Sequence, residues 1–201
     1  MIVKKLLTLS YWKLNSKVFN ETFSYDLKFN ATFRGINELP KSILKSREIK
    51  YIKYYRKAQA NIGTVWYRLF YYPRLVNYSL WTGIGLYNNL NIPKGLIIGH
   101  VGTIVISPDV KFGGNLLLSH GVTIGRENRG SNSGVPSIGK NVCIKCNSTI
   151  VGNITIGDDV LISPNSFVNF DVPSHSVVVA NSAEIKYNAN ATEGYIGHVE
   201  K

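Results

Sequence analysis

The chain of 201 residues contains only two cysteines, and Asp, Glu, Lys and Arg together make up only 17% of it. Two cysteines are too few for a disulfide scaffold, and with no cleavable secretory pattern they favour a reducing compartment. The apolar start is interrupted by Lys4 and Lys5 and is far shorter than the roughly 20 apolar residues that span a bilayer. We therefore expect a cytoplasmic protein of one or two domains.

A six-residue period in apolar residues dominates the second half of the chain. It runs through Ile106, Phe112, Leu118 and Ile124, and again through Ile138, Ile144, Ile150, Ile156, Ile162 and Val168. No α-helix or alternating strand repeats every six residues, so this period predicts a parallel β-helix built from hexapeptides. We assign residues 96–180 to this β-helix, 1–95 to a basic, aromatic-rich and mainly helical region, and 181–201 to a C-terminal tail.

Acidic residues are scarce in the first half, so the positive charge is concentrated there. Residues 1–95 hold sixteen Lys and Arg against four Asp and Glu, whereas residues 96–201 hold seven against eight. We predict a basic helix over 41–58 and an aromatic helix over 61–81 that is broken at Pro73. Two interpretations stay open: these helices cover the open end of the β-helix and pack on neighbouring subunits, or they dock on an anionic membrane at its inner face. No nucleic-acid-binding motif accompanies the charge, so nucleic acid is not an expected partner.

The repeat is interrupted once, between Ile124 and Ile138, where fourteen residues replace six. This loop, residues 125–137, is polar and rich in Gly and Ser, and it carries Arg126 and Arg129. Loops extruded from a rigid solenoid often carry its functional site. We expect the loop to be mobile, or ordered only against a partner.

Two of the four histidines lie close to this interruption. His100 occupies a frame position where an apolar residue is expected. With eighteen residues per coil, His120 is predicted to lie two residues along from the point directly above His100. The two imidazoles form a candidate site, although for His120 a buried structural role is an equal alternative.

The two cysteines spell C-x-x-C at Cys143 and Cys146, but they fall inside the strand repeat. A redox pair of this kind normally lies at a helix N-terminus, and two thiols do not complete a tetrahedral zinc site. We expect a packing role for both cysteines and no metal.

Three segments resemble the hexapeptide-repeat acyltransferases, and within them the serine acetyltransferase-like branch. They read GLIIGHVGTIVI at 95–106, VTIG at 122–125 and IVGNI at 150–154. The resemblance implies a left-handed parallel β-helix, a homotrimer, acetyl-CoA as donor, and a catalytic histidine at His100. His120 is added as a second catalytic candidate because of its predicted position close to His100. The resemblance also implies CoA binding between subunits, for which the candidates are Gly125, Lys140, Lys145, Ser163 and Lys186.

The chain departs from serine acetyltransferases at three places. Gly99 replaces the Asp before the catalytic His, the loop ends in Gly134-Val135-Pro136 instead of Arg-His-Pro, and Asn91 is the nearest counterpart of the Asp that orients the His. A zwitterionic amino acid needs a cation and an anion in its site.

We therefore predict that the acceptor is a sugar hydroxyl, as in polysaccharide O-acetyltransferases. The sugar belongs to a surface polysaccharide, either capsule or lipopolysaccharide, or to its precursor. Asn91, Arg126 and Arg129 are the residues predicted to bind it. The alternatives are a serine O-acetyltransferase of cysteine biosynthesis and a catalytically weak β-helix scaffold.

The expected mechanism is direct acyl transfer with His100 as general base. Imidazole is suited to this role because its ordinary pKa is close to neutral pH. Backbone N–H groups of the Gly-rich coil or of the loop are predicted to stabilise the oxyanion.

Overall fold

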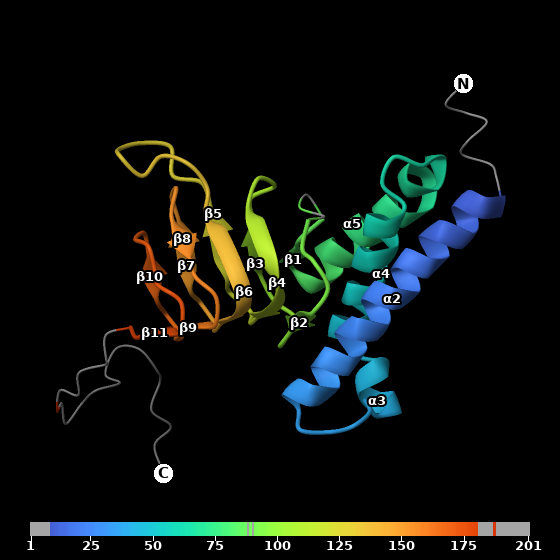
Figure 1. The fold of residues 1–201 in the computed structure, drawn as a ribbon, viewed down its shortest axis with the longest axis horizontal. Helices are drawn as coiled ribbons and strands as arrows, with labels where there is room; N and C mark the ends of the chain where they lie inside the picture. Colours follow the sequence, from blue (N-terminus) through green and yellow to red (C-terminus); the bar gives the residue numbers. More distant parts are fainter. Residues whose placement is uncertain (1–8, 88, 90, 181–186, 188–201) are drawn as a thin grey trace, which may run out of the picture.

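The computed structural model describes residues 9–87, 89, 91–180 and 187, and shows a helical part followed by a solenoid of parallel strands (Figure 1). The helices are α2 (Leu9–Phe33), α3 (Lys41–Leu44), α4 (Arg47–Ala60), the π-helix η1 (Tyr67–Tyr71) and α5 (Tyr72–Thr82). The strands are β1 (Ile84–Gly85), β2 (Leu96–Ile98), β3 (Ile104–Ile106), β4 (Lys111–Leu118), β5 (Thr123–Gly125), β6 (Ser137–Ile144), β7 (Thr149–Val151), β8 (Thr155–Ile156), β9 (Val160–Ile162), β10 (Phe167–Val168) and β11 (Ser176–Val178).

The strands stack into three faces, as a triangular coil requires. One face has the order β1-β3-β5-β7-β10, and a second joins β2, the end of β4, the end of β6, β9 and β11. The third face consists of the starts of β4 and β6 together with β8. All of these ladders are parallel, so the predicted parallel β-helix preceded by helices is confirmed. The first paired strand, β1, lies upstream of the expected start at residue 96.

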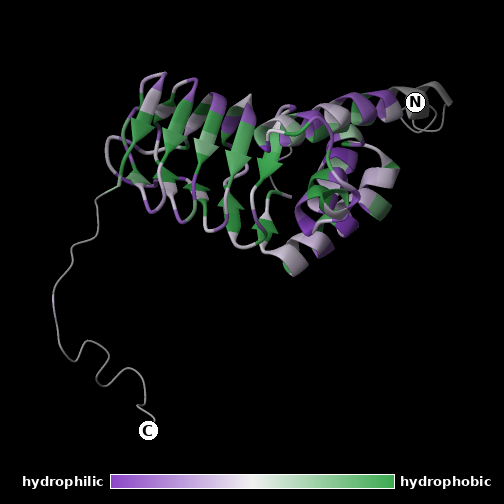
Figure 2. Ribbon diagram, turned by 90° about the horizontal axis from the view of Figure 1, so that it is seen from below, coloured by the Kyte–Doolittle hydropathy of each residue, from purple (hydrophilic) through white to green (hydrophobic). Residues whose placement is uncertain are grey.

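The predicted six-residue column is the core of the solenoid. Every aliphatic residue of the period from Ile106 to Val168 is at most 3% exposed, and only Phe112 is half-buried. Figure 2 shows these strands coloured mainly as hydrophobic, while the helices alternate in character. Burial of this continuous column away from water is the main force that holds the coils together.

The pairing register gives the length of each coil. Thr149 pairs with Phe167, a coil of eighteen residues, and Thr123 pairs with Thr149, a coil of twenty-six. The difference is the predicted eight-residue insertion. Leu96, however, pairs with Leu116, so this coil has twenty residues instead of the expected eighteen.

The basic segment is helical as predicted, but it is divided between α3 and α4. Ser46 separates them, and its side-chain oxygen accepts a hydrogen bond from the N–H of Ile49, which caps the start of α4. In the aromatic segment Pro73 lies in the first turn of α5, directly after η1, instead of breaking a helix. Proline has no N–H to donate to the preceding helical turn, which fits the change from π- to α-helix next to it.

The helices cover the open end of the solenoid, in agreement with one of the two interpretations. Ile49, Ile52 and Tyr55 of α4 and Leu75 of α5 belong to the same buried cluster as the aliphatic column. Trp81 remains 58% exposed, so packing within one chain does not cover it. In the described part of the chain, no helix is long and apolar enough to cross a membrane.

A buried ion pair fixes the helices to the first coil. Arg56 of α4 donates from Nε to Oδ2 of Asp26 on α2 at 2.6 Å, and both side chains are fully buried. Asp26 Oδ1 also accepts from the backbone N–H groups of Gly95 and Leu96, at 2.7 and 3.0 Å. One carboxylate therefore joins two helices and the start of β2.

Candidate functional site

The two predicted histidines lie together at one corner of the solenoid. The register of β2 and β4 places His120 directly above His100, and their ring centroids are 6.1 Å apart. The prediction that His120 lies two residues further along is therefore wrong, because this coil has twenty residues. Both side chains are exposed, which is also contrary to the buried structural alternative.

The assumed frame position of His100 is also wrong. The buried positions that flank it are Ile98 and Ile104, six residues apart, and His100 lies on the corner between them. The equivalent corner of the next coil, between Leu118 and Val122, is two residues shorter. His100 therefore lies on an exposed corner outside the core, as His120 does on the shorter corner of the next coil.

Lys145 and Ser163 follow the histidines along the same edge. The N–H of Ser119 donates to the carbonyl of Ile144, and the N–H of Lys145 donates to that of Ile162. Continuing this register stacks Gly99, Ser119, Lys145 and Ser163 in one row, with His100 and His120 in the adjacent row. Two of the predicted CoA-binding residues therefore lie on the edge that carries the histidines.

Glu48, which the sequence analysis missed, reaches this corner from α4. Its Oε1 accepts a hydrogen bond from the N–H of Val101, the residue after His100, at 3.1 Å. The side chain is half-buried. Its only signal in the sequence is that it is the single acidic residue of the basic segment 41–58.

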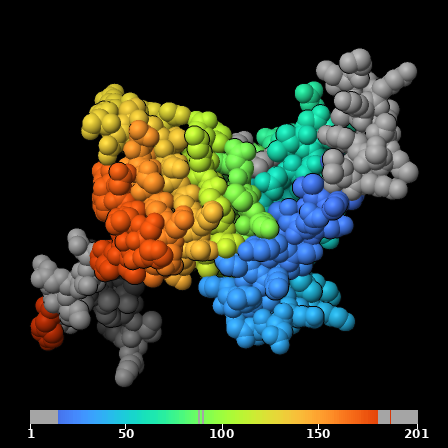
Figure 3. Space-filling view, in the orientation of Figure 1, coloured from blue at the N-terminus to red at the C-terminus, as the bar shows by residue number. Residues whose placement is uncertain are grey.

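The loop lies at another corner. Strand β5 runs from the His120 corner to Arg126, so a full face of the coil separates the loop from the histidines. Arg126 forms an ion pair with Asp109 at 2.6 Å, and Arg129 is exposed. Figure 3 shows the loop in gold, on the opposite side of the molecule from α2 and α3. Within one chain, neither arginine joins the histidine pair.

The loop is ordered by its own chain, contrary to the expectation that it needs a partner. Glu127 and Gly134 exchange backbone hydrogen bonds, both at 2.9 Å. Asn132 accepts from the N–H of Asn153 and donates from its side chain to the carbonyl of Asn169. These contacts tie the tip to the two following coils.

The remaining predicted residues are spread over other sites. Asn91 is exposed, and its backbone N–H donates to Asn89 Oδ1. Gly125 lies at the loop end of β5, and the N–H of Lys140 donates to Asp158 at a different corner. Lys186 lies outside the described residues.

The glycines of the histidine corner are not free oxyanion donors. The N–H of Gly99 donates to Leu118, that of Gly102 to Thr82, and that of Gly121 to Thr103. These three amides already have partners in adjacent turns. The oxyanion site stays a prediction.

The cysteines show no sign of redox or metal chemistry. Both are half-buried free thiols, and burial raises the pKa of the Cys143 thiol above its ordinary value, with a smaller opposing effect of Lys145. Among the residues that the structure describes, no three His, Cys, Asp or Glu side chains gather as a metal site. The absence of a metal remains a prediction.

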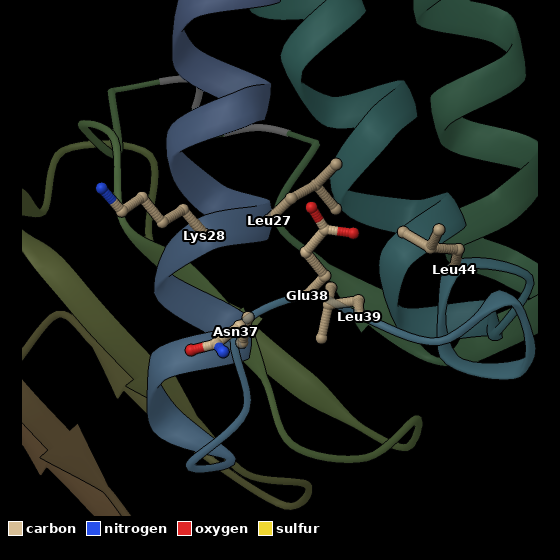
Figure 4. Close-up of a pocket in the computed structure, with 7 residues that line it drawn as sticks. Leu27, Lys28, Asn37, Glu38, Leu39 and Leu44 are labelled. Atoms are coloured by element: carbon tan, nitrogen blue, oxygen red, sulfur yellow. The ribbon is translucent and has the colours of Figure 1, made fainter.

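The described pockets lie away from the histidine pair. One cavity of about 350 Å³ opens between α2 and α3, where Glu38 and the leucines converge while Lys28 points outward (Figure 4). A second, of about 360 Å³, lies beside the loop and includes Arg126 and Asp109. Neither of these two cavities is lined by His100 or His120.

Comparisons with known proteins agree with this architecture. Residues 136–169 match the family described as "Bacterial transferase hexapeptide (six repeats)". This part of the solenoid is a hexapeptide-repeat array. The match implies that the β-helix is left-handed.

Proteins similar to this chain include serine acetyltransferases. The chain is 32% identical over 103 residues to serine acetyltransferase of Helicobacter pylori, which covers 51% of this chain and 60% of that protein. It is 34% identical over 103 residues to serine acetyltransferase 2 of Arabidopsis thaliana, again 51% of this chain but 32% of the relative. The chain therefore matches from about a third to about three fifths of the length of these relatives.

The fold extends further than the sequence similarity. The crystal structure of Neisseria gonorrhoeae serine acetyltransferase in complex with serine aligns with a TM-score of 0.66 at 23% identity, over 90% of this chain and 78% of that one. At this identity the likeness concerns the fold, including the helices before the solenoid.

The predicted polysaccharide acceptor is wrong. The matched relatives are serine acetyltransferases, which favour the alternative that the sequence analysis kept open. The resemblance to polysaccharide O-acetyltransferases finds no support in these matches. The prediction relied on charges missing at Gly99, at Asn91 and at the end of the loop, and it did not consider Glu48, which reaches the corner from another element.

Proposed function

We propose that this protein is a serine O-acetyltransferase that transfers the acetyl group of acetyl-CoA to the hydroxyl of L-serine. The observation that carries the proposal is the exposed pair of His100 and His120, on a hexapeptide solenoid whose relatives have this activity. Imidazole is the side chain best matched to proton transfer near neutral pH, and an exposed corner gives it access to both substrates.

His100 is the proposed general base. One of its ring nitrogens accepts the hydroxyl proton while the serine oxygen forms a bond to the thioester carbonyl carbon. When the tetrahedral intermediate collapses, the C–S bond breaks and the imidazolium returns the proton to the sulfur of CoA. The balance is complete without a covalent acyl-enzyme, and neither Cys143 nor Cys146 is needed as a nucleophile.

Acetyl-CoA is the proposed donor substrate, lying along the edge that continues from the histidines. Lys145 and Ser163 are on this edge, and the Lys145 ammonium suits the negative charge of the CoA phosphates. His120 is assigned to the acceptor side of the same corner. Because the loop and its arginines lie a full face away within one chain, we propose a homotrimer in which the loop of a neighbouring copy closes the site.

The proposal is tested by incubating purified protein with acetyl-CoA and L-serine and following loss of the thioester absorbance. This readout is preferable to a thiol reagent because the protein has two free thiols. We expect turnover, and we expect His100→Ala to lower it by about 10²–10⁴-fold.

His175→Ala is the matched control. His175 is an exposed histidine near the last coil, paired with Asp159 at 2.8 Å, and its loss should leave turnover unchanged. Wild-type protein that does not acetylate L-serine would refute the proposed acceptor. An active His100→Ala variant would refute the assigned base.

A further inference from the structure

Glu48 is a carboxylate beside the histidine corner that lacks a counter-charge. Its described polar contact is the Val101 N–H, which engages Oε1. The neighbouring Arg47 does not pair with it, since its guanidinium stacks over the Trp81 ring at 4.8 Å. None of the ion pairs among the described residues includes Glu48. A half-buried carboxylate in this state is favourable for a cationic ligand.

The other acidic side chains of the described residues are placed elsewhere. On the solenoid, Asp109 holds Arg126, Asp158 accepts from the N–H of Lys140, and Asp159 contacts His175. Glu127 accepts from N–H groups of its own loop, and Asp171 from the N–H of Thr155.

Of the three remaining acids on the helical side, Asp26 is fully engaged by Arg56, Glu21 pairs with Lys17, and Glu38 lines the pocket of Figure 4. Glu48 is therefore the one described carboxylate at the histidine corner.

We infer that Glu48 binds the ammonium group of the acceptor and thereby selects an amino alcohol over a simple alcohol. This inference rests on the proposed function and names a residue for its substrate. The carboxylate arrives from α4, so it supplies the anion that Gly99 cannot. It also places the bound ammonium next to Val101, the residue that follows His100. The inference requires the hydroxyl of the same small molecule to reach the imidazole.

Glu48→Gln isolates the charge, because the amide oxygen can still accept the Val101 hydrogen bond. The two acceptors to compare are L-serine and 3-hydroxypropionate, which lacks only the amino group. A charge-assisted hydrogen bond contributes about 1.5–3 kcal/mol, which corresponds to roughly 10- to 150-fold. We expect the KM for L-serine to rise by about this factor, and the KM for 3-hydroxypropionate to stay constant.

Glu21→Gln is the control, since Glu21 is an exposed glutamate on α2 whose loss should change neither KM. Unchanged kinetics of Glu48→Gln with L-serine would overturn the inference. An equal fall in kcat for both acceptors, with an altered pH profile, would also overturn it, because the carboxylate would then act on His100 and not on the ammonium.

Calorimetric titration without acetyl-CoA separates this inference from the proposed function. L-serine and ethanolamine should bind the wild type and bind Glu48→Gln at least 10-fold more weakly. If such binding is found without acetyl transfer, the proposed function fails and the role of Glu48 stands. If the wild type acetylates or binds L-serine and Glu48→Gln is unaltered, only the role of Glu48 fails. If the wild type neither binds nor acetylates L-serine, both are refuted.

Discussion

Asp26→Asn should strongly destabilise the protein, because it leaves the Arg56 guanidinium buried without its anion. The substitution keeps the shape of the side chain but replaces an acceptor by an NH₂ group facing donors at 2.6–3.1 Å. Arg56 retains only its neutral partners, among them the carbonyls of Ile92 and Pro93. Removal of one partner from a buried ion pair costs about 3–5 kcal/mol.

This loss is a large part of the roughly 5–15 kcal/mol by which proteins of this kind are stable. The measurement is urea unfolding followed by circular dichroism at one fixed protein concentration, because association would make the midpoint concentration-dependent. Glu21→Gln is the control: the Lys17–Glu21 pair is exposed and 3.9 Å apart, and its loss should cost less than about 0.5 kcal/mol. The double variant of Asp26→Asn with Arg56→Gln should cost less than the sum of its parts. A change below about 1 kcal/mol in Asp26→Asn would refute the role assigned to the pair.

Two further predictions concern the histidine corner and the cysteines. Gly102→Ala places a Cβ at 2.9 Å from the Cβ of His120, at a φ of +143°. We therefore expect the rate of acetyl transfer to fall by at least about tenfold, while the far-UV circular dichroism spectrum is retained. Wild-type activity of this variant would contradict the assigned geometry. Because burial raises the pKa of the Cys143 thiol, a smaller fraction of it is thiolate at pH 8 than in free cysteine. Iodoacetamide should therefore label Cys143 more slowly than free cysteine, and the labelling rate should increase as the pH rises beyond 9. Peptide mass spectrometry follows the labelling. Labelling at the rate of free cysteine at pH 8 would show that this thiol is not shielded.

The solenoid could be predicted because its physical cause is local and repeated. Each coil turns an aliphatic side chain inward every sixth residue, so the period from Ile138 to Val168 appears directly in the sequence. The inserted loop could be predicted for the same reason, as an interruption of that period. Corner lengths follow no such rule. The corner between Ile98 and Ile104 has two extra residues, but the apolar period before and after it is unchanged, so the sequence does not reveal them. These residues change which side chains stack on one another in adjacent coils.

The helical half shows the opposite situation, since its decisive contacts join residues far apart in the chain. Asp26 and Arg56 are thirty residues apart, and they meet only because α2 and α4 pack side by side against the first coil. In the sequence, Arg56 is one more cation in a basic segment, with nothing to distinguish it from the exposed Lys53. Composition therefore showed that this segment is basic, and it could not predict that one of its charges is fully buried.

The choice of acceptor depended on the same distinction between neighbours in sequence and neighbours in space. Two charges that a zwitterion would need are missing at Gly99 and at the end of the loop, Gly134-Val135-Pro136. Their loss excludes a zwitterionic acceptor only if no other residue of the site supplies these charges. An electrostatic site requires only that opposite charges lie within a few ångströms of the ligand, whichever element carries them. In our inference Glu48 meets this requirement for the ammonium, and it comes from α4. For the carboxylate, Arg126 is already paired with Asp109, whereas Arg129 is exposed and forms no ion pair among the described residues. Arg129 of a neighbouring copy in the proposed trimer is therefore our candidate for the cation that binds the serine carboxylate.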